Sequence, residues 1–547
     1  MAASIPSSRW ARPRALALAS SVLACLALTG CGPTAAISLQ VGTTALVVPL
    51  GQTAEVEVTV TRSGGSGSVG LTASGAPAWV DVSFDPASLG AGETTSTMSI
   101  ATDDPDGEPA SFTLTVTATG SGVSAEARIE VDVQATDVAG AVVDPYGDPL
   151  SGYTVYLPGS PPQLTGSDGA FTFDAVTVPY DLTVVAPTVG GQTLAQTFVG
   201  LTTGTPSVVP LAAALGQVGD SYSGSATGDL ISATYSPLPA EHAARVCLEG
   251  VDRPLVYSCG TLTAGDGDYF ISGQWFGSPD AQVRVRAVVY HVGADGEPDA
   301  IVASGATPTF TLSDTGNQAQ DITLTATSSQ ATATYDLTVP PGLTVTEHVL
   351  VAHHSQHASF GLESGDSTAT TGTLVAPYFD GIDYSLYAIA YEDPISVERG
   401  SLAWATGLAP GAAVSLELPT PPSLVAPSDG APSVTASTEF TVSNPEGGIL
   451  SFVAIPGGTG VAFVVTTDQA AVRFPDLTAI GLGPTSGATY LWYVISTPDV
   501  GSTDDAVTGD GYLSQFAKLN DATYGGGPGP TTDGRVSTSQ QWNFTVQ

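Results

Sequence analysis

Short runs of alternating apolar and polar residues recur along most of the chain. Val56, Val58 and Val60 alternate with polar residues, and Phe112-Thr113-Leu114-Thr115-Val116 repeats the pattern. Because successive side chains of a β-strand point to opposite faces, these runs predict strands with one buried face. Gly, Pro, Asp or Ser interrupts the runs about every eight to twelve residues, which is typical of antiparallel sandwiches. We find no convincing amphipathic helix longer than two turns, so the pattern predicts an all-β chain.

The chain of 547 residues is longer than one hydrophobic core can serve. Such cores rarely grow past about 250–300 residues. Breaks in the strand pattern and linkers such as Pro419-Thr420-Pro421-Pro422, which should be semi-rigid, divide the chain further. We therefore expect tandem antiparallel β-sandwich domains, joined as a string, after an N-terminal segment. The expected ranges are 1–30, 36–135, 136–215, 216–330, 331–422 and 423–547.

The N-terminal segment has the features of an export signal. Residues 1–30 contain three arginines and no acid, and the apolar run Ala15–Leu28 is too short to span a bilayer. The sequence Leu28-Thr29-Gly30-Cys31 resembles the bacterial lipobox, which implies that Cys31 is lipidated and anchors the mature chain to a membrane. The alternative is an ordinary signal peptide in which Cys31 is incidental. Gly32 stands where an Asp often retains lipoproteins at the inner membrane, so the outer membrane or cell surface is expected.

Two ranges resemble known modules. Residues 36–135, with Trp79-Val80-Asp81-Val82-Ser83-Phe84, are similar to the immunoglobulin-like modules of bacterial exported proteins. Residues 136–215 carry Gly147-Asp148-Pro149-Leu150 and Ser167-Asp168-Gly169-Ala170-Phe171-Thr172-Phe173. They resemble the carboxypeptidase regulatory-like domain, a small transthyretin-like sandwich. That resemblance implies an accessory module without catalytic or metal-binding residues. Related folds include carbohydrate-binding modules.

The remaining ranges also have the pattern of sandwiches. Residues 216–330 and 331–422 show apolar runs and aromatic pairs in a similar order, which indicates two sandwiches of one type. Residues 423–547 contain Tyr490-Leu491-Trp492-Tyr493-Val494 and resemble a fibronectin type III domain. An insertion around residues 501–530 is rich in Gly and Asp, and we expect it to loop out.

Charge and cysteine content narrow the function and the compartment. There are 13 Lys and Arg against 52 Asp and Glu, which gives a net charge of −39 and argues against a nucleic-acid partner. Hydrophobic residues make up 42% of the chain, so this charge does not indicate disorder. Cys247 and Cys259 form an even pair in an exported chain, and we expect a disulfide. The alternative is two buried thiols.

Four of the six histidines are clustered. His348, His353, His354 and His357 lie within ten residues, and imidazoles at a strand end and its following turn could converge on Zn²⁺ or Cu²⁺. On strand alternation His348 and His354 face one side and His353 the other. We therefore favour the alternative, in which the cluster is a polar loop after a strand.

Acidic turns suggest a second kind of metal site. Asp103, Asp104 and Asp106 lie beside Gly107, and carboxylate oxygens are the ligands that Ca²⁺ prefers. The spacing does not complete an EF-hand. Asp-Gly also makes ordinary hairpin turns without a metal, and we favour that interpretation. We therefore expect no cofactor. If these turns do bind a metal ion, Ca²⁺ is the one that they suit.

An aromatic pair is the candidate ligand-binding site. Trp275 and Phe276 lie in a stretch flanked by Gly, Ser and Pro, where aromatic rings could stack on sugars. The alternative, which we favour, is packing in the core or at a domain junction. The sequence contains no nucleophile elbow, no H-E-x-x-H and no Walker loop, so no catalytic residues are assigned.

Together these features predict a lipid-anchored, non-catalytic protein of the cell envelope. It would act as a scaffold or adhesion module that contacts carbohydrate or protein. One alternative is a binding module that depends on Ca²⁺ or Zn²⁺. The other is an accessory of an extracellular hydrolase, or a cryptic hydrolase.

Overall fold

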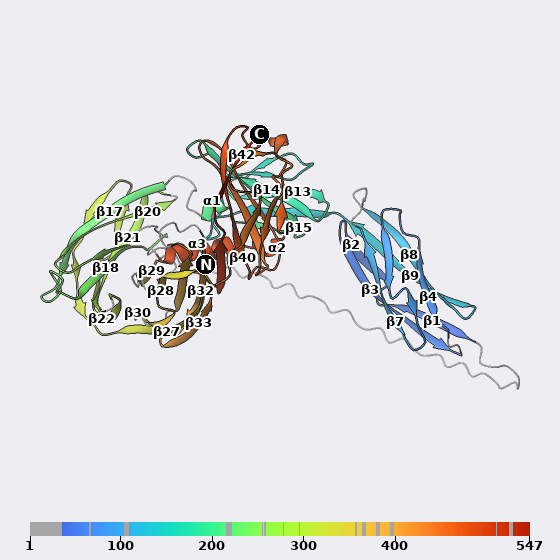
Figure 1. The fold of residues 1–547 in the computed structure, drawn as a ribbon, viewed down its shortest axis with the longest axis horizontal. Coiled ribbons are helices and arrows are strands. Elements are labelled where there is room, and N and C mark those ends of the chain that lie inside the picture. The colour runs from blue at the N-terminus through green and yellow to red at the C-terminus, as the bar shows by residue number, and fades with distance from the viewer. Residues whose placement is uncertain are drawn as a thin grey trace, which may run out of the picture. The chain divides into compact units, whose positions relative to one another are not determined.

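The computed structural model describes residues 35–64, 67–102, 109–214, 221–253, 255, 259–276, 278–294, 296–355, 358–363, 368–378, 383–393, 399–509, 511–523 and 529–547. Cys31, Asp103, Asp104, Asp106 and His357 lie outside these residues. The chain forms two compact units, one of Met1–Val48 with Thr53–Val133 and one of Pro49–Gln52 with Gln134–Gln547. The fold is all-β, as the alternation predicts (Figure 1).

The first unit is a two-sheet sandwich. Its sheets have the strand orders β1-β3-β7-β5 and β2-β9-β8-β4-β6. Val56, Val58 and Val60 of β3 are buried while the residues between them are more exposed, which confirms the face assigned from alternation. The strands are β1 (Ala36–Val41), β2 (Ala45–Pro49), β3 (Thr53–Ser63), β4 (Val69–Ser74), β5 (Asp81–Asp85), β6 (Ser88–Leu89), β7 (Thr95–Ala101), β8 (Ala110–Gly120) and β9 (Val123–Gln134).

The second unit begins with a small sandwich around Phe171, Phe173 and Leu182. A sheet of order β13-β10-β16 covers strands ordered β12-β11-β14-β15. The elements are β10 (Thr136–Val142), β11 (Thr154–Tyr156), β12 (Gln163–Leu164), β13 (Ala170–Val176), β14 (Tyr180–Val185), β15 (Gln192–Leu201), β16 (Ser207–Val208) and α1 (Leu211–Ala214).

The next sandwich has its core around Trp275, Val285 and Leu312. Its sheets have the orders β20-β17-β24 and β19-β18-β21-β22-β26. The strands are β17 (Ser221–Ile231), β18 (His242–Gly250), β19 (Cys259–Leu262), β20 (Asp268–Phe276), β21 (Asp280–Val292), β22 (Pro298–Ala306), β23 (Phe310–Ser313), β24 (Asn317–Ala319), β25 (Ile322–Thr323) and β26 (Thr325–Ala326).

A third sandwich in this unit packs around Tyr335, Leu350 and Leu386. A sheet of order β30-β27-β33 faces strands ordered β32-β31-β28-β29. The strands are β27 (Gln330–Thr338), β28 (Thr344–Ser355), β29 (Ala358–Glu363), β30 (Thr371–Pro377), β31 (Tyr384–Tyr391), β32 (Gly400–Leu408) and β33 (Ala412–Glu417).

The last sandwich has an aromatic core that includes Phe440, Trp492 and Phe544. Phe440 meets both of the other rings edge to face, at centroid distances of 5.2 and 5.3 Å. The elements are β34 (Ser423–Ala426), β35 (Ala431–Val434), β36 (Phe440–Ser443), β37 (Ile449–Pro456), β38 (Gly460–Thr467), β39 (Ala471–Val472), η1 (Thr478–Ile480), β40 (Thr489–Thr497), α2 (Thr503–Ala506), α3 (Tyr512–Thr523), β41 (Gly534–Thr538) and β42 (Trp542–Val546).

The insertion of this last sandwich does not loop out, so that expectation was wrong. It contains α3, a helix of 12 residues that packs against β28 and β29 (Figure 1). Leu513, Ala517 and Leu519 are buried on this helix. The sequence hid the helix because its apolar face is short and glycines flank it.

A single sheet joins three of the sandwiches of the second unit. β15 pairs in parallel with β38, so that Gln192 lies opposite Gly460. β32 pairs antiparallel with β41, so that Trp404 lies opposite Gly534, and we call this pairing the seam. The resulting sheet has 14 strands, with the order β12-β11-β14-β15-β38-β37-β40-β41-β32-β31-β28-β29 along its main path. The second unit is therefore one compact body rather than a string of separate modules.

Candidate functional site

The two cysteines of the second unit are paired. Cys247 of β18 and Cys259 of β19 form a disulfide, and they lie opposite each other in the strand register with their Cα atoms 4.0 Å apart. Cys247 is fully buried. The bond therefore links neighbouring strands within one sandwich.

The structure does not bring the imidazoles of His348 and His353 together. His348 is buried on the inner face of β28, with its ring 4.5 Å from that of Tyr335. His353 lies between two serines, with Nδ1 2.9 Å from the Ser359 hydroxyl and Nε2 2.7 Å from the Ser385 hydroxyl. Its ring packs against Gly529, where a Cβ would come within 2.2 Å. The side chain of His354 lies outside the described part.

The zinc or copper hypothesis therefore fails for His348 and His353. Their spacing of five residues places them on opposite faces of the strand, so their imidazoles cannot converge. Among the described residues, no group of three His, Cys, Asp or Glu side chains is arranged to hold a metal ion. Burial lowers the pKa of His348 to about 4, so this ring is neutral at neutral pH.

Trp275 does not offer a stacking face, so the ligand-binding hypothesis is wrong for this residue, which packs in the core as the favoured alternative predicts. Its side chain is 0% exposed and belongs to the core of its sandwich. The indole Nε1 donates to the carbonyl of Ser278 at 2.8 Å. Strand alternation points Trp275 inward with Tyr269 and Ile271. The side chain of Phe276 lies outside the described residues.

The exposed aromatic ring of β20 is instead Phe270, which is 68% exposed. It lies opposite Thr227 of β17, and Ser272 lies opposite Ser225 in the same pair of strands. Ser225 in turn lies opposite Asn317 of β24. Phe270 therefore rises from a sheet face of hydroxyl and amide side chains, which we call the Phe270 face.

A cavity of the second unit lies where three sandwiches meet. It has a volume of about 400 Å³, and we call it the junction cavity. Leu211 of α1 reaches it from the small sandwich, and Leu402 of β32 reaches it from the third. The last sandwich contributes strand and helix residues. The apolar part of the wall includes Ile389, Leu402, Ile495, Phe516, Leu519 and Val536.

Tyrosines and one carboxylate give this cavity its polar character. Tyr387, Tyr391, Tyr493 and Tyr512 line it, and Glu347 of β28 is the charged residue among them. The Tyr387 hydroxyl donates to Glu347 Oε1 at 2.8 Å. Burial raises the pKa of Tyr391, and the Glu347 carboxylate raises it further. Tyr391 therefore remains neutral at physiological pH.

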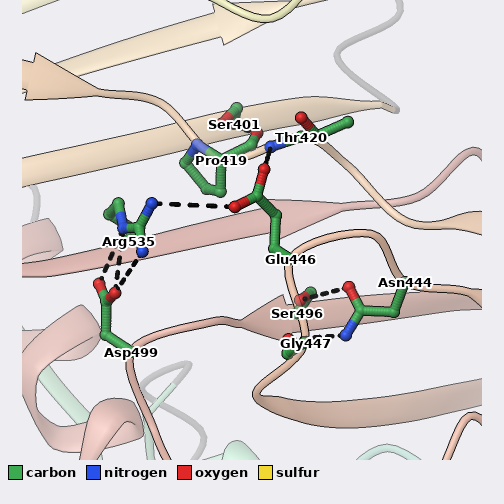
Figure 2. Close-up of polar contacts among 9 residues, drawn as sticks. All are labelled: Ser401, Pro419, Thr420, Asn444, Glu446, Gly447, Ser496, Asp499 and Arg535. Carbon is green, nitrogen blue, oxygen red and sulfur yellow. Dashed lines mark hydrogen bonds and ion pairs between the residues drawn. The ribbon is translucent and has the colours of Figure 1, made fainter.

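Polar contacts hold the seam beside this cavity. Arg535 of β41 bonds to Asp499 and reaches Glu446 at 3.9 Å (Figure 2). The backbone N–H of Thr420 donates to Glu446 Oε1 at 3.1 Å. Ser401 of β32 donates its hydroxyl to the carbonyl of Pro419 at 2.6 Å. The linker between the third and last sandwiches is thereby fixed to both of them.

A smaller cavity of about 180 Å³ is also lined by Tyr512 and is more polar. Its carboxylates bond to neighbouring protein groups. Asp499 accepts from Arg535, and Asp533 accepts from the backbone N–H of Thr406 at 2.8 Å. Asp505 accepts from the Ser502 hydroxyl at 2.8 Å. These contacts stabilise the loops around α2 and β41.

Comparisons with known proteins add little to this picture. No family model matches the chain. No curated protein matches it either. Among solved structures it is similar to the Bacillus anthracis TIE protein, at 11% identity over 70% of this chain and 74% of that chain, with a TM-score of 0.20.

Two further solved structures are similar at the same low level. One is the surface layer protein SbsC, domains 4–9, at 12% identity over 84% of this chain and 63% of that chain, with a TM-score of 0.15. The other is the pilus adhesin SpaC from Lactobacillus rhamnosus GG, at 10% identity over 73% and 53%, with a TM-score of 0.13. TM-scores this low assign neither a fold nor a function to this chain. In the described part of the chain, no helix is long and apolar enough to cross a bilayer.

Proposed function

We propose that the chain is a lipid-anchored, non-catalytic protein of the cell envelope, which acts as a scaffold or adhesion module and contacts carbohydrate or protein. The observation that carries this proposal is the sheet shared by three sandwiches. A shared sheet holds their surfaces in one fixed geometry, and such preorganisation lowers the entropy that binding costs. The lipobox-like sequence that ends at Cys31 supplies the anchor.

The side chains best suited to chemistry have structural partners, which supports a non-catalytic role. His353 contacts two serine hydroxyls. Glu249 contacts two arginines, and Arg535 contacts two acids. Groups held in this way stabilise strand pairings and are not poised to exchange protons with a substrate.

The Phe270 face favours carbohydrate as the partner. A flat sugar ring can stack on an exposed aromatic side chain while hydroxyl and amide groups around it form hydrogen bonds. Phe270 is 68% exposed, and Ser272 and Gln274 are exposed on the same face of β20.

The anchor is tested by mass spectrometry of the protein expressed in a bacterium that processes lipoproteins. We expect a mature chain that begins at an acylated Cys31 and sediments with membranes. Cys31→Ser should abolish acylation, whereas Cys25→Ser, which alters a residue of the signal segment, should leave it unchanged. An unmodified Cys31 in the mature protein would refute the anchor.

The carbohydrate partner is tested by co-sedimentation with purified cell-envelope polysaccharides and by a glycan array. Phe270→Ala should lower binding at least tenfold, because it removes the stacking ring. Leu164→Ala is the matched control, since Leu164 is 70% exposed on β12 and lies in another sandwich. Equal binding by both variants would exclude the Phe270 face and leave a protein partner as the alternative.

A further inference from the structure

The junction cavity has the size and position of a small-molecule site. Its volume of about 400 Å³ falls within the range of about 300–1,000 Å³ that is usual for ligand pockets. Such pockets form preferentially where domains meet. Here β31 and β32 supply one wall, β40 and β41 supply a second, and α3 supplies a third. Nothing in the proposed scaffold role requires this space.

The charge of the cavity wall selects the ligand. Glu347 is half-buried, and no Lys, Arg or His is among the described residues that line the cavity. The Tyr387 hydroxyl, on a side chain that is almost fully buried, fixes the position of one Glu347 oxygen. An anionic ligand would be repelled by this carboxylate, whereas a cation would be attracted more strongly than in water because the surroundings are apolar.

The tyrosines strengthen the same preference. Tyr387, Tyr391 and Tyr493 line the cavity together with Glu347. The face of an aromatic ring carries partial negative charge and attracts cations, with a gain of about 0.5–2 kcal/mol for each contact. The apolar side chains Ile389, Leu402 and Phe516 can bury the hydrocarbon part of a ligand.

We propose that the junction cavity binds a small apolar molecule that carries a positively charged nitrogen, with Glu347 as its counter-ion. The ammonium group lies at the carboxylate among the tyrosine rings, and the hydrocarbon body lies against the apolar wall. This site is separate from the Phe270 face and from the lipid anchor.

The test uses three probes that share a phenyl body and differ in charge: 2-phenylethylamine, 2-phenylethanol and 3-phenylpropanoate. Each is titrated calorimetrically into the full protein purified without its signal segment, at pH 7.5. We expect the amine to bind at least tenfold more tightly than the alcohol, and the carboxylate not to bind. Equal affinities for the three probes, or no binding of the amine at 1 mM, would overturn the proposal.

Variants separate the two parts of the site. Glu347→Gln should lower the affinity for the amine at least tenfold and leave that for the alcohol unchanged. Leu402→Trp should fill the cavity and abolish binding of both. Glu439→Gln, a change at an exposed glutamate of the last sandwich, is the matched control and should bind like the unaltered protein.

Folding is checked for each variant by circular dichroism and by its urea midpoint. If Glu347→Gln does not fold, Tyr387→Phe provides the same test, because it keeps the ring and removes the hydroxyl that positions the carboxylate. Tyr387→Phe should weaken binding of the amine and leave binding of the alcohol unchanged. If no folded variant at these positions changes the affinity for the amine, the amine binds elsewhere and the proposed site is refuted. Loss of carbohydrate binding or of acylation does not bear on this result.

Discussion

Arg535 and Asp499 form a two-pronged ion pair in the last sandwich. Arg535 Nη2 lies 2.6 Å from Asp499 Oδ1, and Nε donates to the same oxygen at 3.0 Å. The bonded carboxylate raises the pKa of Arg535, so this guanidinium stays charged across the physiological range. Because Arg535 lies on β41, this contact fixes the strand that forms the seam with β32.

The strength of this pair can be measured with a double-mutant cycle of Arg535→Met and Asp499→Asn. The two side chains are 28% and 41% exposed, so solvent screening limits the expected coupling to about 1 kcal/mol. Salt at 1 M should reduce that coupling. The control is Arg473 with Glu439, which lie 3.7 Å apart and are 62% and 53% exposed. Urea unfolding should give near-zero coupling for the control, and equal coupling in both pairs would contradict the assignment.

The seam itself depends on a glycine. A Cβ at Gly534 would lie 2.3 Å from Cζ2 of the Trp404 indole, which donates its N–H to the carbonyl of Thr532 at 2.8 Å. We expect Gly534→Ala to destabilise the second unit by about 2 kcal/mol, because the ring must shift in a packed site. Urea unfolding followed by tryptophan fluorescence measures this loss. Gly483→Ala, where the added Cβ meets open space, should be close to neutral, and a similar loss there would argue against the clash.

The fold class was predictable because it follows from the local alternation of apolar and polar residues. Val56, Val58 and Val60 are buried on one face of β3, as their spacing requires. The shared sheet was not predictable in this way, because it pairs Gln192 with Gly460 and Trp404 with Gly534. No local pattern encodes a pairing between residues so distant in sequence.

The candidate sites also differ in how much of each could be predicted from the sequence. The pairing of Cys247 with Cys259 was expected from an even pair of cysteines, whereas the junction cavity needs side chains from three sandwiches. One signal was present in Tyr384–Tyr391, where both faces are mostly apolar or aromatic. A strand of this kind is covered on both sides, which predicts a partner for the outer face that carries Tyr387 and Tyr391.

In the sandwich around Trp275, removing the Glu249 carboxylate should cost more stability than removing one of its arginine partners. This carboxylate is 0% exposed and lies 2.6 Å from Nε of both Arg284 and Arg286. We expect Glu249→Ala to cost about 3 kcal/mol, because it leaves two partly buried guanidinium groups without this carboxylate. Arg284→Met should cost less, since Arg286 still contacts the carboxylate. Urea midpoints measure the order, and a smaller loss for Glu249→Ala than for Arg284→Met would contradict it.

His348 should make the stability of the second unit depend on pH between about 6.5 and 4. Burial lowers the pKa of His348 from 6.5 to about 4, so the unfolded chain binds this proton more tightly than the folded chain. The stabilisation is therefore complete above pH 6.5 and is lost as the pH falls toward 4. We expect a loss of about 2 kcal/mol between pH 7.5 and pH 5, measured by urea unfolding.

The comparison of two histidine variants isolates this effect from the titration of the many carboxylates. His348→Phe should reduce the loss between pH 7.5 and pH 5, because a phenyl ring keeps the contact with Tyr335 and binds no proton. His291→Gln should have the opposite effect, since the bond to Asp299 at 2.7 Å raises the pKa of His291. A raised pKa gives stability that is present below pH 6.5 and is lost as the pH rises. If folded His348→Phe loses as much stability between pH 7.5 and pH 5 as the unaltered protein, His348 does not have a lowered pKa in the folded chain, and the prediction is wrong.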